Sequence, residues 1–215
     1  MERLFRFREG YSAAGAGPQD AGVRASDAWV AAHDPLRAAL RHPTWPALVC
    51  DLALGVDPGT YYCGGLAAHL ATVPVPAGFV HTPNDGQLPR AALLDFMGLA
   101  VDRCVAALGG GRVLLTGFGP FPGVPDNPTA AFVAGRGGLV LRLSGADGAM
   151  YADMGPVIAQ LPDLEGYDAV LALGVDSRQA LVRPRFTVET QAWGMRPALG
   201  PAVRLDALPL GLLGG

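Results

Sequence analysis

The chain contains no lysine: all 16 of its basic residues are arginine, and they are spread along 215 residues. Only 16% of the residues are charged and the net charge is −3, so the sequence offers no dense basic stripe and nucleic-acid binding is not expected. Half of the residues are hydrophobic. A chain of this composition can bury a sizeable core, so we expect one globular domain over residues 1–215 rather than extensive disorder.

Long apolar segments and cysteine pairs are also missing. The first ten residues are charged throughout and lack the apolar stretch of a signal peptide. The apolar runs Ala91–Leu108 and Leu205–Leu213 are interrupted by charge or too short to span a bilayer. The three cysteines have no CxxC spacing, which argues against a disulfide framework and a zinc site. We therefore expect a cytoplasmic protein with no membrane partner, no metal and no cofactor.

Short apolar runs alternate along the chain with segments of helical period. The runs expected to form strands are Ala47–Leu54, Gly78–His81, Arg112–Thr116, Leu139–Leu143 and Ala169–Leu173. The segments expected to form helices are Ser26–Arg41, Gly64–Ala71, Ala91–Leu108, Asn127–Ala134 and Met150–Leu161. Strands with little polar alternation are typical of a sheet covered on both faces. The pattern predicts an α/β fold, a three-layer sandwich with a mostly parallel twisted sheet flanked by helices. Residues 1–25 show no clear period and are expected to form an arm or loop.

Cys63 is the candidate nucleophile, in the segment Gly59–Gly65 (GTYYCGG). It falls where a loop is expected to enter a helix, and the positive end of the helix dipole favours a thiolate there. The alternative is a buried, inert cysteine, the commonest state of a free cysteine. Cys50, in an apolar strand, and Cys104, on an amphipathic helix, are expected in the core.

A nucleophilic thiol needs a base, and His81 is the candidate. It ends the run AGFVH and precedes a Thr-Pro pair, so it is expected where a strand gives way to a loop. Reactive groups gather at the carboxyl ends of the strands in parallel sheets. A purely structural role for this histidine remains the alternative. His33 and His42 are expected at the surface, and His69 is expected to pack or to be solvated on its helix.

The segment Leu115–Thr129 (LTGFGPFPGVPDNPT) places two phenylalanines, Phe118 and Phe121, on a loop rich in proline and glycine after an expected strand. Aromatic side chains on a rigid loop at the carboxyl end of a strand can form the wall of a small apolar pocket. Alternatively, both rings simply fill the core.

Four segments together resemble the motifs of the pyroglutamyl peptidase I family of cysteine peptidases. LLTGFGPFPGVPDNPTA resembles the family's T-G-F-x-P-F-G-G followed by N-P-T or N-P-S, and DPGTYYCGG resembles its nucleophile motif A-G-x-Y/F-V-C-N. AGFVHTP resembles its histidine motif G-F-I/V-H-V/T-P. Thr187–Gly194 resembles its third motif, S/T-x-E-x-x-A-x-N/G. The likeness covers most of residues 34–205.

The resemblance implies a triad in which Cys63 is the nucleophile, His81 the base and Glu189 the acid that orients the imidazole. It further implies that Phe118 and Phe121 form the wall around a lactam ring and that Tyr61 closes this pocket. The implied activity is removal of pyroglutamate from the N-terminus of peptides, without metal or cofactor. Members of the family commonly form homo-oligomers, so an oligomer is a further expectation.

The order of the motifs differs from that of the family, where the T-G-F-x-P-F motif opens the chain and the acid, cysteine and histidine follow. Here Cys63 and His81 come first. The order implies a circular permutation in which residues 26–108 correspond to the family's C-terminal part and residues 112–215 to its N-terminal part, joined at Leu108–Gly111. We then expect the RVLLT strand beside AVLAL, near the centre of the sheet. Domain termini often lie close together at the surface, which makes such a permutation physically reasonable.

Three departures leave alternatives open. Gly64 and Gly194 stand where the family commonly has asparagine, and the chain is lengthened around Gln179–Arg185. If the third motif were out of register, Pro184 or Arg185 would occupy the place of the acid. The chain could then be an inactive relative that binds modified N-termini. A third possibility is an amidase that acts on another cyclic amide.

Overall fold

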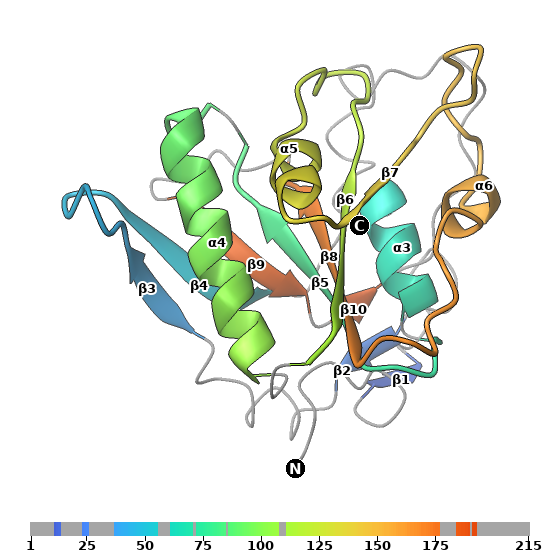
Figure 1. The fold of residues 1–215 in the computed structure, drawn as a ribbon, viewed down its shortest axis with the longest axis horizontal. Helices are drawn as coiled ribbons and strands as arrows, with labels where there is room; N and C mark the ends of the chain where they lie inside the picture. Colours follow the sequence, from blue (N-terminus) through green and yellow to red (C-terminus); the bar gives the residue numbers. More distant parts are fainter. Residues whose placement is uncertain are drawn as a thin grey trace.

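The structure is a computed structural model that describes residues 11–13, 23–25, 37–55, 61–70, 72–84, 86–107, 111–176, 184–189 and 191–192. Its main feature is one mixed, mostly parallel sheet of seven strands in the order β3-β4-β9-β5-β8-β6-β7 (Figure 1). The strands are β3 (Ala38–Arg41), β4 (Val49–Gly55), β5 (Ala77–Thr82), β6 (Val113–Phe118), β7 (Leu139–Leu141), β8 (Ala169–Val175) and β9 (Arg185–Glu189). With its helices the protein is α/β, as the sequence predicts.

Two pairings in this sheet are antiparallel, β3 with β4 and β5 with β9, and the other four are parallel. β9, from the second part of the chain, lies between β4 and β5, from the first part, so residues 38–82 and 113–189 share one hydrogen-bonded framework. β6 pairs with β8, which confirms the expected neighbour. The expectation that β6 lies near the centre is wrong, because among the described strands only β7 separates it from the edge of the sheet.

A second, small sheet has the order β1-β2-β10, from β1 (Tyr11–Ala13), β2 (Val23–Ala25) and β10 (Gln191–Ala192). The first 25 residues, expected as an arm or loop, therefore contribute two short strands. β10 follows closely after β9 in sequence and contacts the helix α3.

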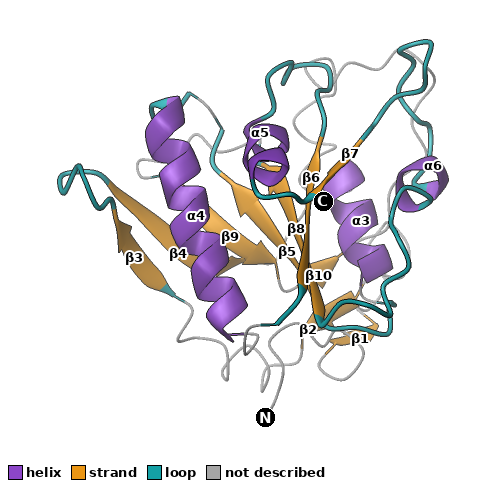
Figure 2. Ribbon diagram, in the orientation of Figure 1, coloured by secondary structure: helices purple, strands orange, loops and turns teal. Residues whose placement is uncertain are grey.

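The helices that the structure describes are α3 (Tyr62–Leu70), α4 (Arg90–Ala107), α5 (Pro128–Gly135) and the short α6 (Gly155–Ile158). α4 and α5 pack against each other, and both lie in front of the sheet in Figure 2. α3 packs against β5 and β8. Asn127 caps α5 by accepting a hydrogen bond from the Thr129 backbone N–H, and Pro128 occupies the first turn, where a missing N–H has no cost. Within the described ranges no helix is both long and apolar enough to cross a membrane.

The core explains why the strongest apolar runs form these elements. Every residue of β5 and of β8 is buried, as expected of inner strands of a mostly parallel sheet. On α4, the buried hydrophobic residues recur at helical spacing, so one face of the helix covers the sheet; they are Ala92, Leu93, Phe96, Met97, Ala100, Val101 and Cys104.

Two of the expected helices are wrong in part. The end of the expected helix Ser26–Arg41 is the strand β3, because pairing with β4 overrides the helix propensity of Ala-Ala-Leu-Arg. Its residues 26–36 lie outside the described part of the chain. The expected helix Met150–Leu161 shrinks to the single turn α6. The helix begins at Gly155, whose N–H donates to Asp153 Oδ1 at 2.7 Å. Met150 instead pairs with Ser144 in an isolated bridge.

The strand β9 is absent from the sequence prediction, although it carries Glu189. Phe186 and Val188 are buried, and Thr187 between them is half-buried, so the segment has the alternation of a strand. Its five residues are flanked by polar residues and a proline, a signal too short to separate from a loop.

Candidate active site

Three side chains from separate elements carry the candidate chemistry. Cys63 is the second residue of α3, His81 is the next-to-last residue of β5, and Glu189 is the last residue of β9. β5 and β9 are antiparallel neighbours, with His81 opposite Thr187. This pairing brings Glu189 next to His81 although 108 residues separate them in sequence.

The imidazole of His81 and the carboxylate of Glu189 form a buried pair. His81 Nδ1 lies 2.7 Å from Glu189 Oε1, and each side chain is only 3% exposed. An Nδ1–H that donates to the carboxylate fixes the orientation and tautomer of the ring and leaves Nε2 for a second partner. The alternatives of Pro184 or Arg185 in the place of the acid do not describe this arrangement, because Glu189 itself meets the histidine.

The sulfur of Cys63 lies over Gly174 of β8. A Cβ atom added to Gly174 would come within 2.8 Å of Cys63 Sγ and 2.6 Å of Phe79 Cζ, so the glycine makes room for the thiol. Gly174 is the direct neighbour of His81 in the parallel β5–β8 pairing. The thiol is therefore held beside the imidazole, on the face of the sheet that α3 covers.

The electrostatics of His81 reflect both neighbours. Burial alone would lower the pKa of the imidazole, because it disfavours the charged form. The charge and hydrogen bonding of Cys63, followed by those of Glu189, outweigh burial and raise the pKa of His81 to about 10. Both neighbours therefore favour the protonated form of His81.

The other two cysteines lie in a different environment. Cys50 and Cys104 are 0% exposed, whereas Cys63 is only partly buried. Burial raises the pKa of both Cys50 and Cys104 to about 12, so they remain neutral thiols at physiological pH. The prediction that these two lie in the core is confirmed.

Gly55, the last residue of β4, gives Glu189 its space. A Cβ atom on Gly55 would come within 2.0 Å of Thr187 Cγ2 and 2.9 Å of Glu189 Oε2. Any larger residue would thus displace the carboxylate or the strand that carries it. The sequence prediction missed both Gly55 and Gly174. The only signal is a glycine within a strand, which often marks a close approach of another group.

The aromatic residues form a series of ring contacts that reaches His81. The Phe79 ring meets the His81 ring edge-on at 5.0 Å, and the Phe118 ring lies 6.3 Å from that of Phe79. Phe118 is 1% exposed. Phe121 is half-buried and pairs with Val124 across a tight turn. Tyr61 is half-buried just before α3 and meets the ring of Tyr62 edge-on.

The loop that carries these two phenylalanines is braced by its own N-P-T residues. The Phe118 N–H donates to Thr129 Oγ1 at 3.1 Å, and Asn127 Nδ2 donates to the Gly119 carbonyl at 3.2 Å. Thr129 Oγ1 in turn donates to Asn127 Oδ1 at 2.8 Å. Asn127 and Thr129 are both buried, so this network fixes the start of the loop.

The remaining histidines differ from one another. His42 is buried, at 3% exposure, and not at the surface as the sequence prediction has it. Its Nδ1 accepts from the backbone N–H groups of Thr44 and Trp45, and its Nε2 contacts Asp95 on α4, which draws it out of solvent. His69 is half-buried, and burial lowers its pKa. His33 lies outside the described residues.

Other expected features also fall outside the described residues: Gly59, the lengthened stretch 177–183 and Gly194. Across the part of the chain that the structure describes, no three histidine, cysteine, aspartate or glutamate side chains are grouped to hold a metal ion. Comparisons of the chain with protein-family models, curated proteins and solved structures find no match.

Proposed function

We propose that the protein is a cysteine exopeptidase that removes pyroglutamate from the N-terminus of peptides. The observation that carries the proposal is the buried Glu189–His81 pair at 2.7 Å with Cys63 at the imidazole. A nucleophile, a base and an acid that orients the base meet here from three separate elements, in the arrangement that activates a thiol.

In the proposed reaction, His81 takes the proton of Cys63, and the thiolate attacks the carbonyl carbon of the pyroglutamyl residue. Glu189 holds the imidazole through Nδ1 and stabilises its positive charge. Backbone N–H groups at the start of α3 stabilise the oxyanion, because they have no partners within the helix. His81 then protonates the departing amine, and water hydrolyses the thioester to release pyroglutamate and the free thiol.

The proposed substrate pocket is apolar because the lactam ring of pyroglutamate carries no charged amine. Phe118 and Phe121 would form its wall and Tyr61 would close it. The ring contacts from His81 through Phe79 to Phe118 support this placement, since they put Phe118 on the same face of the sheet as the imidazole. A reactive thiol also suits a reducing compartment such as the cytoplasm.

The proposal includes the circular permutation and a sandwich with helices on both faces of the sheet. Its support is that β9, which follows the Leu108–Gly111 joint, lies between β4 and β5, which precede it, in one sheet. The end of the joint is also fixed: the Arg112 N–H donates to Asp168 Oδ2 at 2.8 Å, and the Asp168 N–H donates to the Arg112 carbonyl at 2.8 Å. Gly111 has φ +103°, which only glycine adopts readily, and this lets the chain turn into β6.

The test is hydrolysis of a fluorogenic pyroglutamyl amide by the wild type and by Cys63→Ser, with the corresponding prolyl amide as a second substrate. The proposal predicts release of the fluorophore from the pyroglutamyl amide alone, and none with Cys63→Ser. Binding of a pyroglutamyl peptide without hydrolysis would instead identify an inactive relative. Hydrolysis of a different cyclic amide, with the pyroglutamyl amide left intact, would identify the other amidase.

A further inference from the structure

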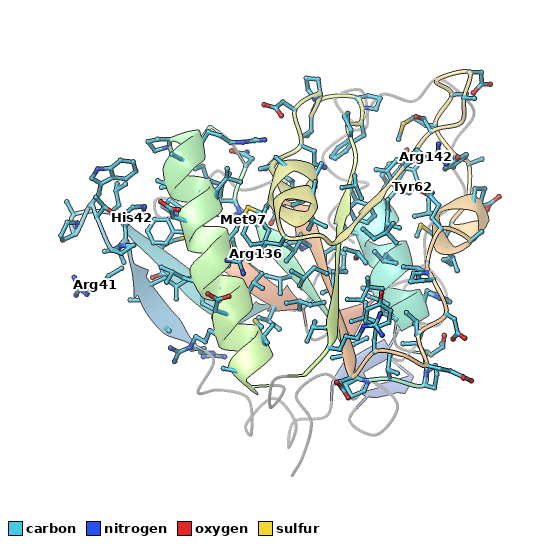
Figure 3. All side chains as sticks on the ribbon, in the orientation of Figure 1. Arg41, His42, Tyr62, Met97, Arg136 and Arg142 are labelled. Carbon is cyan, nitrogen blue, oxygen red and sulfur yellow. The ribbon has the colours of Figure 1, made fainter. Side chains whose placement is uncertain are left out.

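Tyr62, the residue before the candidate nucleophile, is buried, and its hydroxyl is hydrogen-bonded. It is 2% exposed, and its hydroxyl donates to the backbone carbonyl of Tyr151 and contacts that of Leu143 at 3.4 Å. Figure 3 shows Tyr62 between α3 and the chain segment that follows β7. Burial raises the pKa of the Tyr62 phenol, so the hydroxyl stays protonated and acts as a hydrogen-bond donor.

The two carbonyls belong to one closed turn between β7 and α6. The Tyr151 N–H donates to the Leu143 carbonyl at 2.9 Å, and the Gly145 N–H donates to the Ala149 carbonyl at 2.9 Å. These bonds close residues 143–151, here called the anchor turn. The Tyr62 hydroxyl binds at its open end and so links α3 to a segment more than 80 residues away in sequence.

The first turn of α3 has little intrinsic stability of its own. Tyr62 and Cys63 are followed by Gly64 and Gly65, and glycine is among the poorest helix formers. No acidic residue in this turn interacts with the helix dipole. The hydrogen bond from the Tyr62 hydroxyl to a carbonyl outside the helix therefore helps to fix the position of this turn.

Cys63 follows Tyr62 directly, so any rotation or shift of this turn moves the sulfur. The sulfur lies over Gly174, beside the imidazole of His81. A shift of about 1 Å between reacting groups can lower the rate about a hundredfold, so the position of the sulfur must be held closely. In the nucleophile motif that this segment resembles, the residue before the cysteine is valine, which has no hydroxyl to form such a bond.

We propose that Tyr62 is a positioning residue: its hydroxyl anchors the first turn of α3 to the anchor turn and thereby holds the Cys63 sulfur at the His81 imidazole. Its hydroxyl binds backbone carbonyls of the anchor turn, so its role is exerted through the position of Cys63. The inference rests on the proposed role of Cys63 as the nucleophile, but not on the identity of the substrate.

The test compares Tyr62→Phe, which keeps the ring and removes the hydroxyl, with the matched control Tyr167→Phe. Tyr167 precedes β8 at the opposite end of the strand from Gly174, and its ring packs beneath the Arg112 guanidinium. Three quantities are measured for each: kcat and KM on the pyroglutamyl amide, the rate of Cys63 alkylation by iodoacetamide, and Tm. We expect Tyr62→Phe to lower kcat and the alkylation rate about tenfold or more, with KM changed less than about twofold. Tyr167→Phe should leave kcat, KM and alkylation unchanged.

A Tyr62→Phe variant with lower Tm but wild-type kcat and alkylation would show that Tyr62 only packs, and would overturn the proposal. If the wild type does not hydrolyse the substrate, the proposed function fails, and the alkylation rates alone then decide the positioning role. If Tyr62→Phe does not fold, Gly148→Ala replaces it. Gly148 has φ +79° in the anchor turn, where a Cβ atom meets no neighbour within 4 Å but strains the backbone. This variant should slow alkylation about twofold or more, and an unchanged rate would overturn the proposal.

Discussion

Replacing Glu189 by glutamine removes the negative charge of the buried pair but keeps an oxygen that can accept the Nδ1–H of His81. Both side chains are 3% exposed, so solvent screens their interaction weakly. Two unit charges about 4 Å apart interact by about 4 kcal/mol at an effective dielectric constant of about 20. Since about 1.4 kcal/mol corresponds to a factor of ten in rate, loss of this stabilisation of the imidazolium should lower kcat by about 10² to 10³.

The pH dependence of Glu189→Gln has a definite sign. The carboxylate is one of the groups that raise the pKa of His81, and burial opposes them. Without the charge the pKa of His81 falls, so the imidazolium is lost at lower pH, and the alkaline limb of kcat/KM should move to lower pH than in the wild type. Steady-state rates on the pyroglutamyl amide between about pH 6 and 10 measure both effects. The matched control is Glu165→Gln, at an exposed position. A folded Glu189→Gln variant with kcat within about threefold of the wild type would refute the role of Glu189.

Two further predictions concern the thiol. Iodoacetamide should modify Cys63 in the folded protein and spare Cys50 and Cys104, because at pH 7 a pKa of about 12 leaves only about one thiol in 10⁵ ionised. Peptide mass mapping measures which cysteine is labelled, and early labelling of Cys50 or Cys104 would contradict the prediction. Gly174→Ala should lower kcat about tenfold or more, because its Cβ would come within 2.8 Å of the Cys63 sulfur, whereas Gly135→Ala, where a Cβ meets nothing within 4 Å, should have wild-type kcat. Equal kcat for the two alanine variants would contradict the placement of the sulfur.

The sequence predicts those parts of the fold that a single strong pattern determines. β5 and β8 are continuous apolar runs, and α4 is a long segment with apolar residues at helical spacing, so all three are predicted within two residues. β3 and β9 are missed because pairing with neighbouring strands, and not local preference, makes them strands. Such pairings depend on residues far away in the sequence, which a local pattern does not contain.

The three candidate catalytic residues could be predicted from the sequence, but the residues that position them could not. Cys63, His81 and Glu189 follow from the motifs, and the structure brings them together. The space that Gly55 and Gly174 leave around them follows only from the packing, because a glycine in a strand has no pattern that names the atom approaching it. The hydrogen bonds of the Tyr62 hydroxyl cannot be predicted from the sequence either, since their acceptors are backbone carbonyls, which every residue carries.

The central claim is that the Cys63 sulfur forms a thioester with a pyroglutamyl group. The direct test is to mix the protein with excess pyroglutamyl amide, quench in acid within the first turnovers and map peptides by mass spectrometry. We expect one pyroglutamyl group on the peptide that contains Cys63, its decay as substrate is exhausted, and no such adduct in Cys63→Ala. Release of pyroglutamate that persists in Cys63→Ala, or an adduct on another residue, would contradict it.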